Sequence, residues 1–141
     1  MRTKPGDVWL ADLGLASKVR PVVIVSRDDP DPPRALVIYM PLTTQNRGST
    51  YELILPKLSF LNRDSIANVQ GLGSVARARL ERKLGKLPDE VMQEIKQTIA
   101  FALDLDLDDL EERSLLIHQF DLGSRRYFSS SGMPCRGLRA W

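Results

Sequence analysis

An arginine and a cluster of hydroxyl, amide and guanidinium groups stand beside two separate apolar segments of the chain. Arg20 directly precedes the apolar run 21–25, and the sequence Thr-Thr-Gln-Asn-Arg-Gly at residues 43–48 follows a second apolar run. A guanidinium pairs bidentately with phosphate, and a hydroxyl donates a hydrogen bond to a phosphate oxygen. Together they can bind a phosphodiester and stabilise the charge that develops during its cleavage, without a metal or cofactor. The pattern predicts metal-independent cleavage of RNA.

Five segments with the composition of β-strands are expected to position these groups. In chain order they are residues 8–13, 22–26, 35–40, 51–55 and 65–70. The segment 22–26 contains no charged residue, which predicts a strand buried on both faces. The segment 27–34 is rich in proline and aspartate, and we expect a surface loop there because proline cannot join a sheet ladder.

The hydrophobic period changes from strand-like to helical near residue 88. Pro88, Asp89 and Glu90 form a favourable helix start, since proline fits the first turn and acids favour the positive end of the helix dipole. Apolar residues then recur at spacings typical of one helix face, at positions 91, 92, 95, 99 and 103. Closely spaced strands followed by a helix predict an α+β fold, a mostly antiparallel sheet or small barrel closed by a C-terminal helix.

Length and composition are those of one globular domain. The 141 residues suffice for a single core, with 43% hydrophobic and 27% charged residues. The net charge of +2 is too small to require a nucleic-acid partner by itself. A single cysteine, Cys135, excludes an internal disulfide and suits a reducing cytoplasm. No secretion signal is seen, and no apolar run approaches the roughly 20 residues of a membrane helix, so we expect a soluble cytoplasmic protein.

The last part of the chain has a different composition. Residues 104–112 contain six acids interleaved with leucines, whereas residues 121–141 contain four arginines and one aspartate. We therefore expect a domain at residues 1–105 and an extension at residues 106–141. The extension is either a loosely packed tail or an arm that binds RNA or a partner.

Five motifs, in this order and spacing, resemble the MazF/PemK family of toxin endoribonucleases from bacterial toxin–antitoxin modules. They span roughly residues 5–105 and are Pro5-Gly6-Asp7-Val8-Trp9 with Asp12, Arg20 to Ser26, Pro41 to Gln45 with Arg47-Gly48, Arg63-Asp64-Ser65 with Gln70, and the helix from Pro88 to Leu103. The resemblance implies an SH3-like barrel with a C-terminal helix, usually a homodimer. It also implies metal-independent cleavage of single-stranded RNA at short sequences, by attack of the ribose 2′-hydroxyl on the adjacent phosphate. The implied partners are this RNA and a cognate antitoxin whose acidic, apolar tail occupies the RNA groove.

The resemblance assigns the catalytic roles to Arg20 and Thr43. Arg20 is suited first to stabilising the transition state and second to donating a proton to the leaving oxygen, whereas an arginine that stays protonated is a poor general base. Thr43 would hold a phosphate oxygen. Without the family, the favoured interpretation of Arg20 is a surface arginine before a buried strand, and the more common role of a threonine such as Thr43 is to cap a turn.

Further residues are assigned to RNA binding, namely Lys18, Thr44, Gln45, Arg47 and Gln70. Gln45 can contact a base edge and Arg47 the backbone, while Gln70 matches a family position near the site. The alternative is ordinary turn chemistry for residues 44–47 and solvated charge for Lys18. Arg63, a weaker candidate for a phosphate contact, has the same alternative.

Other residue types argue against other mechanisms. Trp9 is expected in the core rather than as a platform for base stacking. His118 is the only histidine, so one chain cannot supply a paired-histidine mechanism. No Cys/His cluster has the spacing of a zinc site, and no metal ligand is predicted.

The chain departs from the family pattern at several positions. The connection 13–19 is shorter than the substrate-gating loop of many members, and Ala67 and Val69 stand where some members carry an arginine and an aspartate implicated in catalysis. Leu72 likewise replaces a family arginine. Two other functions therefore stay open. One is a catalytically weak or inactive homologue that still binds an antitoxin, and the other is a gyrase poison resembling the CcdB toxins, for which the C-terminal Trp141 would matter.

Overall fold

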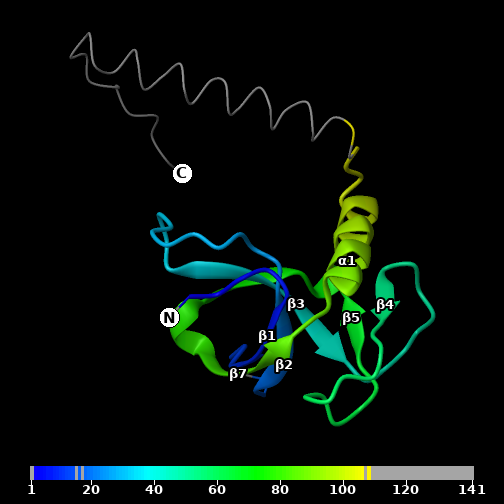
Figure 1. Cartoon of the computed structure of the whole chain (residues 1–141), viewed down its shortest axis with the longest axis horizontal. Helices are drawn as coiled ribbons and strands as arrows, with labels where there is room; N and C mark the ends of the chain where they lie inside the picture. Colours follow the sequence, from blue (N-terminus) through cyan, green and yellow to red (C-terminus); the bar gives the residue numbers. More distant parts are fainter. Residues whose placement is uncertain (1, 15, 17, 107, 109–141) are drawn as a thin grey trace. The chain divides into compact units, whose positions relative to one another are not determined.

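The computed structural model describes residues 2–14, 16, 18–106 and 108. The chain divides into two units, Met1–Asp104 and Leu105–Trp141. All strands of the described residues and the helix α1 (Asp89–Ala102) belong to the first unit (Figure 1). Most of the predicted extension lies outside the described residues, including His118, Cys135 and Trp141. The predicted division of the chain at residue 105 therefore stays a prediction.

Short antiparallel strands form the framework of the first unit. They are β1 (Asp7–Ala11), β2 (Arg20–Ile24), β3 (Leu36–Thr43), β4 (Glu52–Ile54), β5 (Ile66–Asn68), β6 (Gly73–Ala76) and β7 (Leu80–Lys86), with the 3-10 turns η1 (Val69–Gly71) and η2 (Arg77–Arg79). The hydrogen-bonded order is β4-β5-β3-β2-β1-β7, and β6 pairs with β3. Every ladder is antiparallel, which confirms the predicted fold class. Within the described residues the order does not close into a ring.

Alternating side chains of β2 divide the core into two clusters on opposite faces of the sheet. Val23 belongs to the cluster that α1 covers, whose buried members are Val8, Val23, Met40, Leu42, Leu55, Ala67, Val69, Leu87, Met92 and Ile95. Val22 and Ile24 belong to the other, whose buried members are Trp9, Ala11, Val22, Ile24, Val37, Val75 and Leu80. Because Val22, Val23 and Ile24 are fully buried, two-sided burial is confirmed for these residues of the predicted strand 22–26, whereas Val25 and Ser26 lie beyond β2 and are half-buried. Trp9 lies in the core, also as predicted.

Helix α1 covers the first cluster through one apolar face. Its first turn carries the acids Asp89 and Glu90, and Met92 and Ile95 are buried, as the sequence period predicts. Leu103 is 53% exposed because the helix ends at the preceding residue. The prediction of an apolar face is therefore confirmed within the helix and wrong for Leu103, the last position that it included. No helix among the described residues has the length and apolar character of a membrane span.

The sequence pattern does not predict β6 or β7. Strand β7 lies at the end of the hydrogen-bonded order, paired only with β1 through a ladder with two register shifts. Its exposed central residues are Glu81, Arg82 and Lys83, a composition typical of an edge strand. The predicted fifth strand also ends early, because the Asn68 side chain accepts a hydrogen bond from the Gln70 N–H and starts η1 there.

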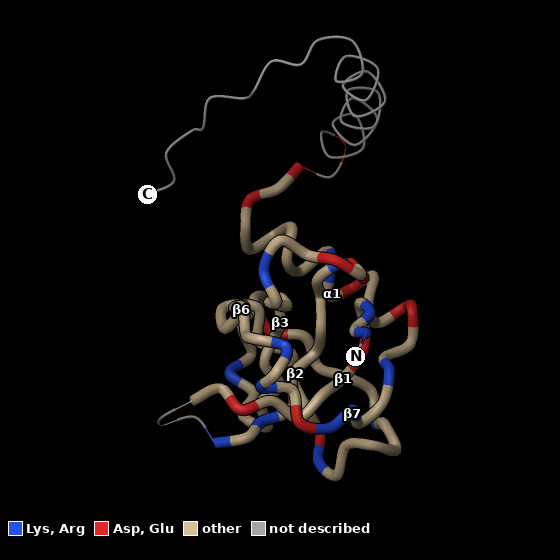
Figure 2. The backbone as a smooth tube through the Cα atoms, turned by 90° about the vertical axis from the view of Figure 1, so that its left-hand side faces the viewer, with Lys and Arg blue, Asp and Glu red and all other residues tan. Residues whose placement is uncertain are grey.

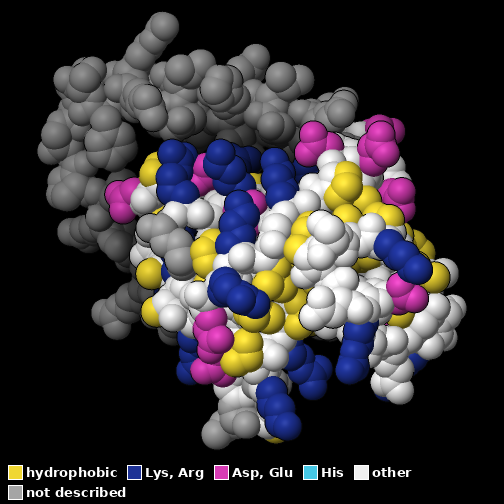
Figure 3. Space-filling model, turned by 60° about the horizontal axis from the view of Figure 1, so that its bottom comes forward, with side chains coloured by type: hydrophobic (Ala, Val, Ile, Leu, Met, Phe, Trp, Pro, Cys, Tyr) yellow, Lys and Arg dark blue, Asp and Glu magenta, His cyan; other side chains and the backbone are white. Residues whose placement is uncertain are grey.

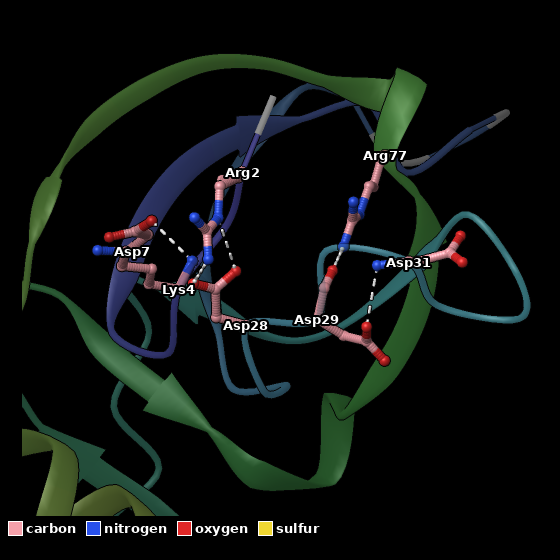
Figure 4. A network of polar contacts seen from close by, with 7 residues as sticks. All are labelled: Arg2, Lys4, Asp7, Asp28, Asp29, Asp31 and Arg77. Carbon is pink, nitrogen blue, oxygen red and sulfur yellow. Dashed lines mark hydrogen bonds and ion pairs between the residues drawn. The ribbon is translucent and has the colours of Figure 1, made fainter.

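The connection 27–34 is a surface loop, as predicted, and polar contacts hold it against the sheet (Figure 4). Arg2 pairs with Asp28 at an Nη2–Oδ2 distance of 2.9 Å. Arg77 donates from Nη2 to the main-chain oxygen of Asp29 at 2.9 Å, and the Asp31 N–H donates to Asp29 Oδ1 at 3.0 Å. Arg77, which is half-buried in η2, therefore holds this loop in place.

Candidate functional site

Cross-strand register brings the two predicted catalytic residues together. In the ladder between β2 and β3, Val22 lies opposite Pro41 and Val23 opposite Met40. Continuing this antiparallel register toward the start of β2 brings Arg20 level with Thr43. Residues opposite one another in such a pair project from the same face, with Cβ atoms about 5 Å apart. The paired residues of this ladder end at Val22 and Pro41, and the groove that both Arg20 and Thr43 line places these two residues on one surface.

Arg20 and Thr43 line the same open groove. Its volume is about 650 Å³, and its lining residues are Arg20, Pro21, Leu42, Thr43, Thr44, Gln45 and Ser65. Four of the predicted site residues thus meet here. Ser65 is an addition: it belongs to a motif of the resemblance, but the sequence alone does not show that it faces Arg20.

The Thr43 hydroxyl has both a structural and a chemical capacity. Its oxygen accepts a hydrogen bond from the Gln45 N–H at 3.2 Å, which shapes the turn after β3. A hydroxyl also carries one O–H donor, which this bond does not use. Turn capping and phosphate binding are therefore compatible in the same residue.

Arg20 presents an exposed guanidinium to the groove. Among the described residues no carboxylate lies within ion-pairing distance of it. A free, planar fork of donors in a groove is the arrangement that a phosphate requires. Lys and Arg positions are spread over several strands and connections of the first unit (Figure 2), and a number of these side chains gather on one face (Figure 3).

Gln45 and Arg47 lie on the exposed connection between β3 and β4. The Arg47 N–H donates to Glu52 Oε2 at 2.9 Å, and the Gly48 N–H donates to Asn46 Oδ1 at 2.7 Å. Gly48 adopts a φ of +65°, a left-handed conformation that glycine accommodates without strain. The connection is therefore held by hydrogen bonds from its main-chain N–H groups to the side chains of Glu52 and Asn46, while the side chains of Gln45 and Arg47 are exposed.

Lys18 lies in a second hollow, not in the groove of Arg20. This hollow has a volume of about 830 Å³ and is lined by Asp12, Leu13, Gly14, Ala16, Lys18, Val19 and Arg79. Gly14, with a φ of +87°, allows the close approach of Arg79, because an added Cβ would lie 3.0 Å from its Nη1. Sequence reasoning missed Arg79. The signal was the pair of arginines at 77 and 79, but only the structure separates the loop-holding Arg77 from the exposed Arg79.

Gln70 and Arg63 are also outside the groove lining. Gln70 is exposed on η1, which packs closely on β3: a Cβ added at Gly71 would lie 2.4 Å from Pro41 Cγ. Arg63 lines a separate hollow of about 400 Å³, which is formed by residues of the connection that leads from β4 to β5. Both residues therefore flank the site rather than form it.

Two of the positions that depart from the family pattern are occupied by core residues. Ala67 and Val69 are buried, at 0% and 3% exposure, in the cluster that α1 covers. Leu72 is half-buried and packs against the same cluster. These side chains support the sheet beneath the groove and offer it no polar group. Within the described part of the chain, no three His, Cys, Asp or Glu side chains are grouped so as to hold a metal ion.

Comparison with known proteins identifies the family and agrees with the fold. Residues 4–103 match the family model described as PemK-like, MazF-like toxin of type II toxin–antitoxin system. A protein of Mycobacterium tuberculosis named probable endoribonuclease MazF5 is 34% identical over 100 residues, which cover 70% of this chain and 91% of that protein.

Solved structures of similar proteins also agree with the fold. An endoribonuclease in complex with its cognate antitoxin, from a mycobacterial species, superposes with a TM-score of 0.65 at 25% identity, covering 74% of this chain and 97% of that one. Mycobacterium tuberculosis toxin MazF-mt6 superposes with a TM-score of 0.63 at 28% identity, covering 71% and 98%. In each case nearly all of the relative is matched by about three quarters of this chain.

Proposed function

Because the chain belongs to the PemK-like, MazF-like toxins of type II toxin–antitoxin systems, a family with endoribonuclease members, we propose that it cleaves single-stranded RNA. The cleavage is metal-independent and sequence-selective. The observation that carries this proposal is the meeting of Arg20 and Thr43 in one open groove, where neither a metal nor a cofactor is needed to bind a phosphate.

The proposed reaction is an internal transfer at phosphorus. The ribose 2′-oxygen attacks the adjacent phosphate, the bond to the 5′-oxygen of the next nucleotide breaks, and a 2′,3′-cyclic phosphate forms. The proton of the 2′-hydroxyl is released to solvent. Arg20 donates a proton to the departing 5′-oxygen, and the neutral guanidine then takes up a proton from solvent, which restores the guanidinium. Arg20 and Thr43 bind the non-bridging oxygens, whose negative charge grows in the transition state.

The remaining predicted residues are proposed to hold the RNA on either side of the cleaved bond. Thr44 and Gln45 lie in the groove itself, and Gln45 is suited to contact a base edge. Arg47 contacts the backbone from the next part of the connection. Lys18 binds a neighbouring phosphate in the second hollow, and Gln70 approaches from η1 beside β3.

Arg79 is proposed to share the phosphate contact with Lys18, which makes a prediction about salt dependence. Arg79→Gln should lower the slope of log Kd against log salt by about 0.7, the value for one phosphate contact on a single strand, and leave kcat within about twofold. The measurement is fluorescence anisotropy with an RNA that lacks the 2′-hydroxyl at its cleavage site. Arg34→Gln, an exposed arginine of the 27–34 loop, is the matched control. An unchanged slope in Arg79→Gln would remove this residue from the RNA path.

The proposed partners follow the family. A cognate antitoxin would place an acidic, apolar tail in the same groove, where its carboxylates meet Arg20. One of the similar solved structures holds such an endoribonuclease with its cognate antitoxin. The proposed working state is a cytoplasmic homodimer.

A weak or inactive homologue is the second candidate, and one observation favours it. Ala67 and Val69 are apolar and buried in the core. These two positions therefore do not provide the polar groups that some members of the family use. Binding of an antitoxin without turnover of RNA would be the expected behaviour. A gyrase poison is less well supported, because the groove is rich in phosphate-binding groups.

One experiment separates these functions. Purified protein is incubated with a long single-stranded RNA in EDTA, and both ends of the fragments are mapped. Discrete cuts that leave 5′-hydroxyl ends, found by direct kinase labelling, are the expected result. RNA that stays intact at high protein concentration would contradict the proposed activity and leave antitoxin binding as the function to test.

A further inference from the structure

Glu52 and Asn68 form a cross-strand pair. This pair joins the connection after β3, which carries Arg47, to the turn η1, which carries Gln70. Strands β4 and β5 lie side by side (Figure 1), and their register places Glu52 opposite Asn68. Glu52 is the first residue of β4 and Asn68 the last of β5. Opposed residues of an antiparallel pair share a face, so these two side chains occupy one end of the same ladder.

Each member of the pair accepts a hydrogen bond from a different functional segment. Glu52 Oε2 accepts from the Arg47 N–H at 2.9 Å. Asn68 Oδ1 accepts from the Gln70 N–H at 3.1 Å, which is the cap of η1. Both anchoring side chains are half-buried, whereas the side chains of Arg47 and Gln70 are exposed. Glu52 and Asn68 are thus partly shielded from solvent, whereas the side chains of Arg47 and Gln70 are accessible to a ligand.

The main chain connects the two anchors. The Val69 N–H donates to the Tyr51 oxygen at 3.0 Å, directly beside both members of the pair. The Glu52 N–H donates to the Ser49 oxygen at 3.1 Å and closes the turn that leads into β4. The connection after β3 and the turn after β5 are therefore joined to a single short ladder.

The connection after β3 is held at both ends. At its start, the Gln45 N–H donates to Thr43 Oγ1 at 3.2 Å, and further along, the Arg47 N–H donates to Glu52. Residues 44–48 are all exposed and bury no apolar side chain that would fix their position. The Glu52 carboxylate is a charged acceptor, which makes its bond to a main-chain N–H stronger than a neutral one. The connection that carries Gln45 and Arg47 is therefore held by Thr43 at its start and by Glu52 further along.

We propose that Glu52 and Asn68 are positioning residues that determine the sequence preference of the RNA site. They act through the connection that carries Gln45 and Arg47, and through Gln70, rather than by touching RNA, and they hold these two segments at a fixed separation. Base recognition by an amide depends on such placement, because a hydrogen bond weakens steeply with distance and angle. This inference rests on the proposed ribonuclease function.

Paired substitutions separate the hydrogen-bond acceptor from the rest of the side chain. Glu52→Gln and Asn68→Asp keep an acceptor oxygen in place, whereas Glu52→Ala and Asn68→Ala remove it. The ratio of kcat/KM for the preferred RNA sequence to that for a single-base variant is expected to fall about tenfold in the alanine variants. The acceptor-keeping variants should stay within about twofold of the wild type. Glu81→Ala and Asn62→Ala, exposed residues elsewhere, are the matched controls.

The outcomes that overturn the inference are distinct from those that overturn the function. If the wild type cuts discrete sites and Glu52→Ala cuts the same sites with the same ratio, the pair does not determine preference. The same conclusion follows if Glu52→Gln loses as much discrimination as Glu52→Ala. If the wild type cuts no RNA, the proposed function fails.

Amide hydrogen exchange in the wild type tests the hydrogen bonds to Glu52 and Asn68 directly. It needs no RNA, and it does not depend on whether a variant folds. The N–H groups of Arg47 and Gln70 should exchange more slowly than the N–H of Thr44, for which the described residues provide no acceptor. Equal exchange at all three would show that the anchors do not hold in solution, and would overturn the inference whatever the activity.

Discussion

Arg20→Ala is expected to lower kcat/KM for RNA cleavage by about 10³-fold, mostly through kcat. Arg20 lines the groove beside Thr43, and no carboxylate of the described residues pairs with its guanidinium. The negative charge that it would stabilise grows as the phosphorus becomes five-coordinate. Arg20→Lys should recover only part of the rate, because an ammonium cannot form the bidentate fork. The measurement is steady-state cleavage of a labelled single-stranded RNA in EDTA.

The control for Arg20 is Arg34→Ala, which removes an exposed arginine from the 27–34 loop without approaching the groove. It should cleave like the wild type. Thermal unfolding of each variant shows whether the sheet is intact, and we expect no large change for Arg20→Ala because its side chain is exposed. Activity of Arg20→Ala within about threefold of the wild type would contradict the assignment of the site.

Thr43→Val is expected to cost about 10²-fold in kcat/KM. Valine has nearly the shape of threonine but provides neither the O–H donor for a phosphate oxygen nor the acceptor for the Gln45 N–H. Thr43→Ser keeps both and should retain most of the activity. Thr50→Val, at an exposed threonine of the same connection, is the control for the substitution itself.

A double-mutant cycle tests whether Arg20 and Thr43 act on the same phosphate. If they do, the variant with both Arg20→Ala and Thr43→Val should lose less than the product of the two single losses, because the second deletion acts on a contact already weakened. Fully independent effects would indicate that Thr43 contributes only through the turn and not through the substrate.

Local pattern and local chemistry were enough to predict much of this molecule. The uncharged run of β2 implied burial on both faces, the spacing of Met92 and Ile95 implied a helix face, and proline ruled out a strand at 27–34. These predictions hold because each depends on residues close together in the chain. The order and spacing of the five motifs indicated the family, because these are properties of the sequence itself and need no knowledge of the fold.

Contacts between distant segments decided the rest. Strand β7 is charged and would not be stable alone, and it exists because β1 offers it a ladder. Ala67 and Val69 are core residues because β5 and η1 pack against β3 and α1, which no neighbouring residue reveals.

The site divides in the same way. The sequence by itself determined which groups are available for phosphate chemistry, namely Arg20 and Thr43 with the residues that follow it. Only the tertiary structure decided that these two share a groove, that Lys18 lies with Arg79 in another hollow, and that Gln70 stands to one side. The physical reason is that side-chain chemistry belongs to each residue, whereas proximity depends on strand register, which is set by pairing across the whole sheet.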